Sequence, residues 1–135
     1  MKEKILIVEG NPMHMKLVEM TLRTKNYTLL KANDGEEVLD MVIRKQPNLI
    51  IMDINLSGMT GFEVSKKLRE NPAFNHTPII AITAYAMKGD MEKIIEAGCD
   101  VYLPKPIDTR ELPIRVAEML LGRQKLSDIN GDGNE

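Results

Sequence analysis

The sequence predicts an α/β fold, a doubly wound five-stranded parallel sheet with helices on both faces. Three observations support this prediction. Short apolar runs alternate with longer amphipathic segments along the chain, which is typical of a parallel sheet built from strand–helix–strand units. The run at residues 49–52 is continuously apolar, as expected for a strand buried on both faces of such a sheet. Several of the apolar runs are followed directly by a polar residue; the run at 49–52 is followed by Asp53.

Five segments have the length and composition of strands. They are residues 5–8, 27–30, 49–52, 78–82 and 101–103. Glycine, proline or other turn residues separate each of them from the helix that follows. The segment at 27–30 is the least apolar, so we expect it to be the most exposed strand.

Five segments between and after these strands are predicted to be helical. The first begins near Pro12, where the missing proline N–H is harmless. Asp34 and Thr60 each precede a glutamate by three residues, the pattern of a capping box. The fourth helix covers residues 87–97 and ends at Gly98, and the last begins near Thr109. Their predicted inner faces carry Leu17, Val18 and Leu22; Val38, Leu39, Val42 and Ile43; Phe62, Val64 and Leu68; and Leu112, Val116 and Leu120.

Length and charge limit the function classes. The 135 residues suit one domain, at 1–122, with Gly122 ending the last helix and a mobile polar tail at 123–135. The net charge of −2 gives no global electrostatic case for nucleic acid. No apolar run approaches the ~18 residues of a membrane span, and the single cysteine, Cys99, fits a reducing compartment. We therefore expect a cytoplasmic protein.

Four polar residues stand at strand ends. Glu9, Asp53, Thr83 and Lys105 follow or end the first, third, fourth and fifth strands. Each alone could be a strand-end residue, a helix cap or a solvated lysine. In a parallel sheet, however, these ends lie on one edge, where open α/β sheets bind their ligands. The combination therefore predicts a site.

Phosphoryl transfer to a carboxylate suits these residue types. An aspartate can act as the nucleophile, and a second carboxylate with a backbone carbonyl can hold Mg²⁺. An ammonium and a hydroxyl can stabilise the charge on phosphoryl oxygens. A Mg²⁺ phosphatase with an aspartyl nucleophile is disfavoured, because it needs a second acid two residues later, where this chain has Asn55.

Over residues 3 to about 121 the chain resembles the response-regulator receiver family, in particular the receivers of chemotaxis and cell-division control. The motifs that carry the resemblance are residues 5–9, 52–55 with Gly61, 81–84 and 102–106. The resemblance implies the flavodoxin-like strand order 2-1-3-4-5. It also implies a two-component signalling protein that accepts a phosphoryl group, and not an enzyme acting on a separate substrate.

The resemblance implies a role for each matching residue. Asp53 matches the phosphoacceptor, and Lys105 matches the amine that binds the phosphoryl group. Thr83, followed by Ala84, matches the switch hydroxyl on that group, and Tyr102 matches the aromatic that changes rotamer with it. Further implied features are a cis bond at Lys105–Pro106, metal binding by Glu9, Asp53 and the Asn55 carbonyl, and control of dephosphorylation by Asn55 and Tyr85.

Position 10 departs from the family pattern, which has a second metal-binding acid there. This chain has Gly10, so the acidic ligand position is vacant and Mg²⁺ binding is expected to be weak. A second function class therefore stays open, a receiver that acts as an interaction module without phosphorylation. Ser57 replaces a common proline, which affects only loop stiffness.

The resemblance also implies partners. The phosphodonor is a sensor histidine kinase or a phosphotransfer protein. The downstream target is a protein bound through the fourth helix, fifth strand and fifth helix, with the chain a monomer or weak dimer. His14 and His76 have no partner at metal-ligand spacing and are interpreted as surface or boundary residues. The tail opens like a Ca²⁺ loop at Asp128, but the chain ends before the loop's bidentate glutamate.

Overall fold

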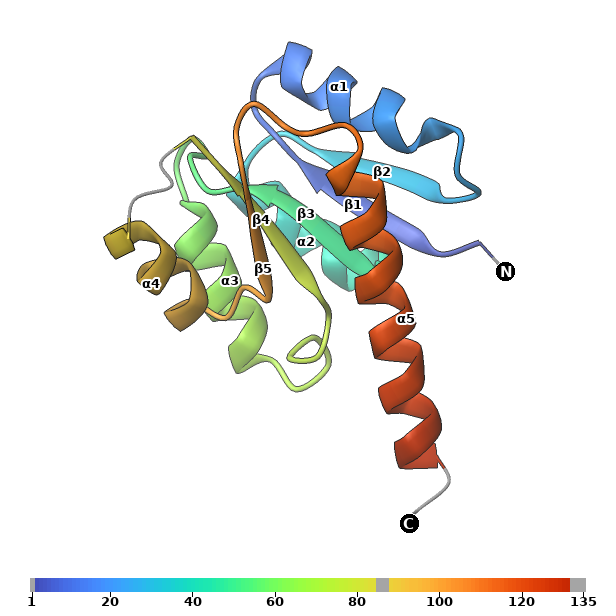
Figure 1. Cartoon of the computed structure of the whole chain (residues 1–135). Helices are drawn as coiled ribbons and strands as arrows, with labels where there is room; N and C mark the ends of the chain where they lie inside the picture. The colour runs from blue at the N-terminus through green and yellow to red at the C-terminus, as the bar shows by residue number, and fades with distance from the viewer. Residues whose placement is uncertain (1, 85–87, 132–135) are drawn as a thin grey trace.

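The computed structural model describes residues 2–84 and 88–131 as five strands and five helices (Figure 1). The strands are β1 (Lys4–Val8), β2 (Thr28–Ala32), β3 (Leu49–Asp53), β4 (Ile79–Thr83) and β5 (Val101–Pro104). The helices are α1 (Pro12–Arg23), α2 (Gly35–Lys45), α3 (Gly61–Glu70), α4 (Lys88–Glu96) and α5 (Glu111–Gly131). The predicted alternation of strands and helices is confirmed.

The strands form one sheet in the order β2-β1-β3-β4-β5, and every neighbouring pair is parallel. This is the order that the family resemblance implies. β3 lies at the centre, and all five of its residues are buried. The order places the carboxyl ends of β1, β3, β4 and β5 side by side on one edge of the sheet.

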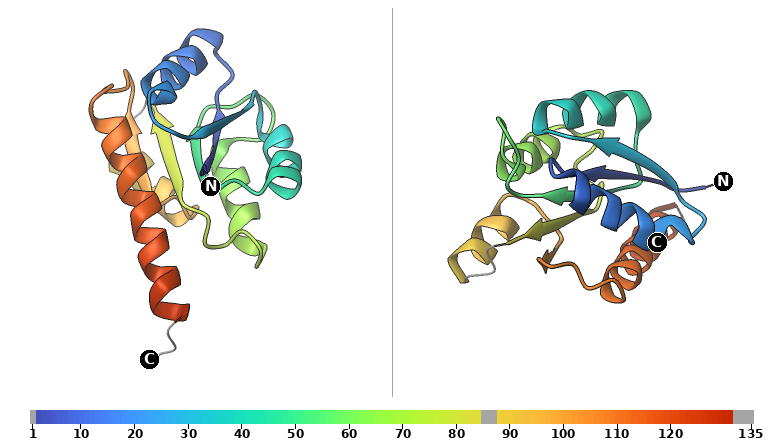
Figure 2. Two further views of the ribbon diagram at one scale, coloured as in Figure 1. Left: turned by 90° about the vertical axis from the view of Figure 1, so that its right-hand side faces the viewer. Right: turned by 90° about the horizontal axis from the view of Figure 1, so that it is seen from above.

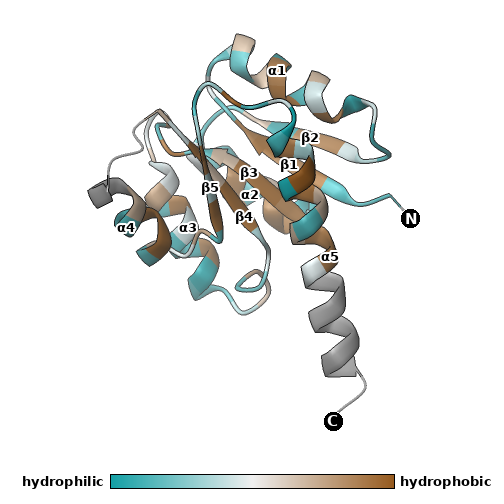
Figure 3. Ribbon diagram, in the orientation of Figure 1, coloured by the Kyte–Doolittle hydropathy of each residue, from teal (hydrophilic) through white to brown (hydrophobic). Residues whose placement is uncertain are grey.

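Helices cover both faces of the sheet, α1 and α5 on one side and α2, α3 and α4 on the other (Figure 2). Because side chains alternate along a strand, Leu6, Ile50 and Met52 join one core cluster. Ile5, Leu49 and Ile51 join the other. The central strands are accordingly apolar along their length (Figure 3). No helix in the described ranges is long and apolar enough to span a bilayer.

The buried apolar faces of α1 and α2 are narrower than the sequence pattern predicted. Leu17 is 36% exposed and Ile43 is 62% exposed, so their assignment to inner faces is wrong. Both lie beside residues that are fully buried, Val18 and Val42. A helix that packs on a sheet with one face buries about every third or fourth residue, and a neighbour of a core position lies at the margin of that stripe.

Thr60 begins α3 with the predicted capping box. Its hydroxyl accepts the Glu63 N–H, while the Glu63 carboxylate accepts the Thr60 N–H. The box at Asp34 is only half formed. The Asp34 side chain accepts the Glu37 N–H, but Glu37 Oε1 accepts the N–H of Asn33 instead of that of Asp34. Both helices nevertheless start where the caps predicted.

Replacing Thr60 by alanine is expected to lower the free energy of unfolding by about 1 kcal/mol, because the Glu63 N–H loses its capping acceptor. Thr60→Ser keeps the hydroxyl and should remain close to the parent protein. Urea denaturation of the three proteins measures the difference. Equal losses in the alanine and serine variants would show that the cap is not the cause.

The last helix does not end at Gly122. α5 continues to Gly131 and extends past the end of the sheet (Figure 1). A glycine inside a helix costs only about 1 kcal/mol relative to alanine, and strong helix formers follow it at residues 123–126. Residues 123–131 are therefore helical in backbone, and the mobility of a C-terminal tail stays a prediction.

Candidate functional site

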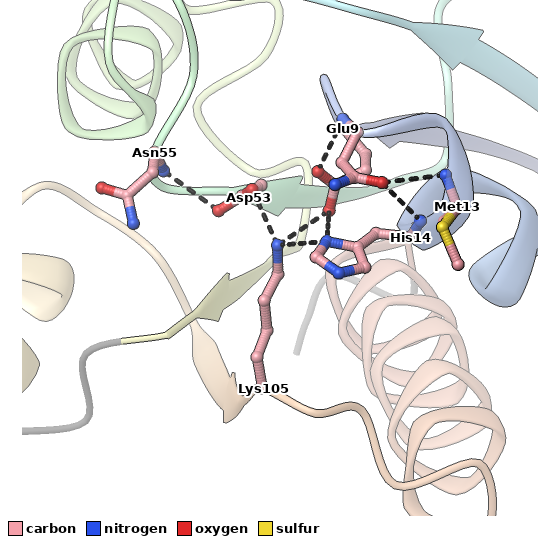
Figure 4. A network of polar contacts seen from close by, with 7 residues as sticks. Glu9, Met13, His14, Asp53, Asn55 and Lys105 are labelled. Atoms are coloured by element: carbon pink, nitrogen blue, oxygen red, sulfur yellow. Dashed lines mark hydrogen bonds and ion pairs between the residues drawn. The ribbon is translucent and has the colours of Figure 1, made fainter.

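Four of the predicted residues lie on the edge of the sheet formed by β1, β3, β4 and β5. Glu9 follows β1, Asp53 ends β3, Thr83 ends β4 and Lys105 follows β5. Glu9, Asp53 and Lys105 are in direct contact through the lysine side chain (Figure 4). Thr83 is buried at the end of β4, where it pairs in register with Pro104.

The Lys105 ammonium is the centre of the cluster. Its Nζ lies 2.9 Å from Asp53 Oδ2 and 3.1 Å from Glu9 Oε1. These distances are those of charge-assisted hydrogen bonds. A lysine from the end of β5 thus joins the carboxylates that follow β1 and end β3.

The two carboxylates are buried, Glu9 at 3% and Asp53 at 5% exposure. Burial alone would lower the pKa of the Lys105 ammonium. Its hydrogen bonds to Asp53 and Glu9, and the attraction of their charges, outweigh that effect and raise the pKa above its ordinary value. One ammonium balances only one of the two negative charges, so the cluster retains an attraction for a further cation.

Backbone N–H groups satisfy the remaining carboxylate oxygens. Asn55 N–H donates to Asp53 Oδ1 at 3.0 Å, and Asn11 N–H donates to Glu9 Oε2 at 3.1 Å.

A Cβ added at Gly61 would lie 2.8 Å from Ile54 Cα and 3.0 Å from the Asp53 carbonyl oxygen. Only glycine therefore lets the start of α3 approach the chain beside Asp53 so closely.

His14 also belongs to this cluster, which the sequence interpretation missed. Its Nδ1 lies 3.0 Å from Lys105 Nζ and 3.9 Å from Glu9 Oε1 (Figure 4). Helical side chains tilt toward the helix N-terminus, and α1 begins at this edge of the sheet. A histidine in the first turn therefore leans over the strand ends. That placement, and not metal-ligand spacing, is the signal that could have found it.

The sequence-family model of the response regulator receiver domain matches residues 5–117 of the chain. The chain belongs to this family. Receiver domains accept a phosphoryl group in two-component signalling and act as regulators, not as classical enzymes.

Relatives and solved structures support the same assignment. The polar-differentiation response regulator DivK of Brucella anthropi is 41% identical over 107 residues, covering 79% of this chain and 87% of DivK. The chemotaxis response regulator CheY4 of Vibrio cholerae has a TM-score of 0.83 at 27% identity, over 88% of this chain and 99% of CheY4. A second similar structure is the receiver domain of the sensor histidine kinase PA1611 of Pseudomonas aeruginosa, which was solved with a coordinated magnesium ion. Its TM-score is 0.82 at 31% identity, and the match covers 89% of this chain and 98% of the PA1611 domain.

The carboxylates of Glu9 and Asp53 are oxygen donors of the kind that suits Mg²⁺. Glu9 and Asp53 supply carboxylate oxygens with an excess of negative charge, which a hard cation prefers. Within the described ranges, no three acidic, histidine or cysteine side chains are arranged to hold a metal ion. Gly10 brings no side chain beside Glu9, and its role as a vacant ligand position stays a prediction.

Thr83 and Tyr102, which are expected to act as the switch, lie on β4 and β5. The Tyr102 hydroxyl donates to Met91 Sδ at 3.2 Å, which ties the middle of β5 to α4. Ala84 is exposed directly after Thr83. The Lys105–Pro106 bond is cis, as the resemblance implied.

Asn55 is exposed beside Asp53, and Tyr85 lies outside the described residues, so their control of dephosphorylation stays a prediction.

Proposed function

We propose that this receiver is a phosphorylation switch in which Asp53 accepts a phosphoryl group from a histidine kinase or phosphotransfer protein. The observation that carries the proposal is the 2.9 Å contact between Asp53 Oδ2 and Lys105 Nζ. A cation lies beside a buried carboxylate, at the sheet edge where ligands bind in this class of fold, which supports a nucleophilic role for Asp53.

The proposed reaction transfers the phosphoryl group between two side chains. An oxygen of Asp53 forms a bond to phosphorus while the bond from phosphorus to the donor's histidine nitrogen breaks, and the imidazole keeps the electron pair. Lys105 stabilises negative charge on the phosphoryl oxygens. The Thr83 hydroxyl and the backbone at Ala84 follow β4 on the same edge and are proposed to bind the same oxygens.

Glu9, Asp53 and the Asn55 carbonyl are proposed to hold Mg²⁺. When bound, the ion would neutralise charge on the phosphoryl oxygens. The net negative charge of the cluster supports this assignment. Gly10 makes the site weaker than one with a further acid.

Gly10 also supports a second candidate function. A receiver with a poor metal site could bind partners in one state, without phosphorylation. The two candidates differ in one measurable respect, whether Asp53 becomes modified at a physiological Mg²⁺ concentration.

Output is proposed to use the face made by α4, β5 and α5. An open groove of ≈ 530 Å³ lies there, lined by side chains that include Ile95, Val101, Tyr102 and Arg115. Tyr102 lines this groove from β5, the strand beside β4, which ends in Thr83. A shift of Thr83 toward the phosphoryl group would change the space beside the Tyr102 ring and so connect site and surface.

Mapping of the modified residue tests the proposed function. The protein is incubated with acetyl phosphate and Mg²⁺, treated with borohydride to reduce the acyl phosphate, and digested for mass spectrometry. The reduction releases phosphate and converts the phosphorylated aspartate to homoserine, so we expect one homoserine per chain, at position 53. No modification at a physiological Mg²⁺ concentration would favour the interaction module, and modification at another acid would overturn the site assignment.

A further inference from the structure

We infer that His14 is a positioning residue of the phosphoryl site, which holds the Lys105 ammonium from α1 through its Nδ1 lone pair. The inference rests on the proposed function for its effect on phosphorylation. The contact itself is a property of the unmodified protein.

The hydrogen bonds of Lys105 support the inference. An ammonium has three N–H donors and no acceptor. Lys105 Nζ has three acceptors in reach, Asp53 Oδ2 at 2.9 Å, His14 Nδ1 at 3.0 Å and Glu9 Oε1 at 3.1 Å. His14 therefore takes the third donor of a side chain that is only 15% exposed.

The charge of Lys105 fixes the form of the imidazole. Because the ammonium can only donate, Nδ1 must accept, and the ring proton must sit on Nε2. An imidazole with a proton on Nδ1 would place two donors 3.0 Å apart. The inference therefore predicts a single tautomer for His14.

The start of α1 holds His14 in place. The Asn11 side chain caps the helix and accepts the N–H groups of Met13 at 2.9 Å and His14 at 3.2 Å. Asn11 N–H in turn donates to Glu9. The same short segment therefore orients a carboxylate and an imidazole toward one ammonium.

His14 differs from the two acids in what it does to the ammonium. The carboxylates attract Lys105 toward themselves, and Asp53 is also the group to be modified. A neutral acceptor on α1 fixes the third direction of the ammonium without adding negative charge near an incoming phosphoryl group. Loss of His14 should therefore leave Lys105 charged but less well oriented, which affects the chemical step more than binding of the phosphodonor.

Three variants separate this role from a general effect on folding. His14→Leu removes the acceptor and leaves an apolar side chain of similar size in its place. His14→Asn keeps an acceptor, because the amide oxygen is as many bonds from Cβ as Nδ1 is. His76→Leu is the matched control, since His76 is exposed in the loop before β4.

The first measurement uses the unphosphorylated protein. Two-dimensional NMR of the ring nitrogens, assigned with His76→Leu, should show His14 with a proton on Nε2 and none on Nδ1. The Lys105 Nζ resonance should shift in His14→Leu and remain unchanged in His76→Leu. A proton on Nδ1, or an unshifted Lys105 resonance, would overturn the inference.

The second measurement is the rate of phosphorylation by acetyl phosphate. At saturating phosphodonor, His14→Leu should be about tenfold slower, the effect of losing a hydrogen bond to a charged group. The half-saturating concentration should change little, and His14→Asn should recover most of the rate. Equal rates in the parent and leucine variant, or no recovery with asparagine, would contradict a positioning role. If no protein were phosphorylated, the proposed function would fail, and the NMR result would still decide whether His14 holds Lys105.

Discussion

Asp53→Asn is expected to abolish phosphorylation, with at least a hundredfold loss of phosphoryl incorporation from acetyl phosphate. An amide is not a nucleophile toward phosphorus at neutral pH, whereas a carboxylate is. Among the residues that the structure describes, Glu9 is the other acid in contact with Lys105, and it follows β1 instead of ending a strand. Mass spectrometry of the intact protein measures the loss.

The fold should survive this substitution, which makes the result interpretable. Asparagine has the shape of aspartate and retains one acceptor for the Asn55 N–H or for Lys105. It also removes one of two buried carboxylates that share one ammonium, which relieves like-charge repulsion. The free energy of unfolding should stay within about 1–2 kcal/mol of the parent value.

Asp108→Asn is the matched control for Asp53→Asn. Asp108 is an exposed acid whose Oδ1 accepts the N–H groups of Arg110 and Glu111 before α5. These two hydrogen bonds hold the pKa of its carboxyl below the usual range. Phosphorylation should be unchanged in this variant. Label that persists in Asp53→Asn, or disappears in Asp108→Asn, would be incompatible with Asp53 as the acceptor.

The strands and the site edge could be predicted from the sequence because each depends on local pattern and one topological rule. A short, continuously apolar run such as 49–52, followed by turn residues, is typical of a strand buried inside a parallel sheet. Once the strands are parallel, Glu9, Asp53 and Lys105 must share an edge. The strand order does not follow from pattern, since it depends on which crossovers the helices make, and it came from the family resemblance.

Contacts between distant segments were beyond sequence reasoning. Arg69 Nε donates to the Gly98 carbonyl at 2.8 Å, and its Nη2 pairs with Asp100 at 2.9 Å. These bonds join the last turn of α3 to the turn before β5, and nothing in the spacing of the residues indicates them. For His14, the position in the first turn of α1 could have indicated the edge of the sheet, but not the contact with Lys105, which is 91 positions away.

Gly10→Asp is expected to raise the affinity for Mg²⁺ by about 10–100-fold. Ligand charge tunes affinity in oxygen-donor sites, and loss of even an outer partner of a metal ligand costs about 10–100-fold. The position accepts a side chain, since a Cβ at Gly10 would meet only the Asn33 carbonyl oxygen at 3.4 Å, an ordinary contact. Isothermal titration calorimetry with Mg²⁺ measures the change, and phosphorylation at low Mg²⁺ should become faster in parallel.

Two variants separate charge from shape at position 10. Gly10→Asn adds a side chain of the same size without charge, and Gly10→Ala only restricts the backbone, so both should bind Mg²⁺ much more weakly than Gly10→Asp. Without Mg²⁺ the aspartate variant should be less stable than Gly10→Asn, because a third carboxylate joins Glu9 and Asp53 around one ammonium. Added Mg²⁺ should reverse that order, since an ion that binds only the folded state stabilises it. Equal Mg²⁺ affinity in the aspartate and asparagine variants would show that position 10 is not a ligand position in this receiver, and that Glu9 and Asp53 alone determine its metal binding.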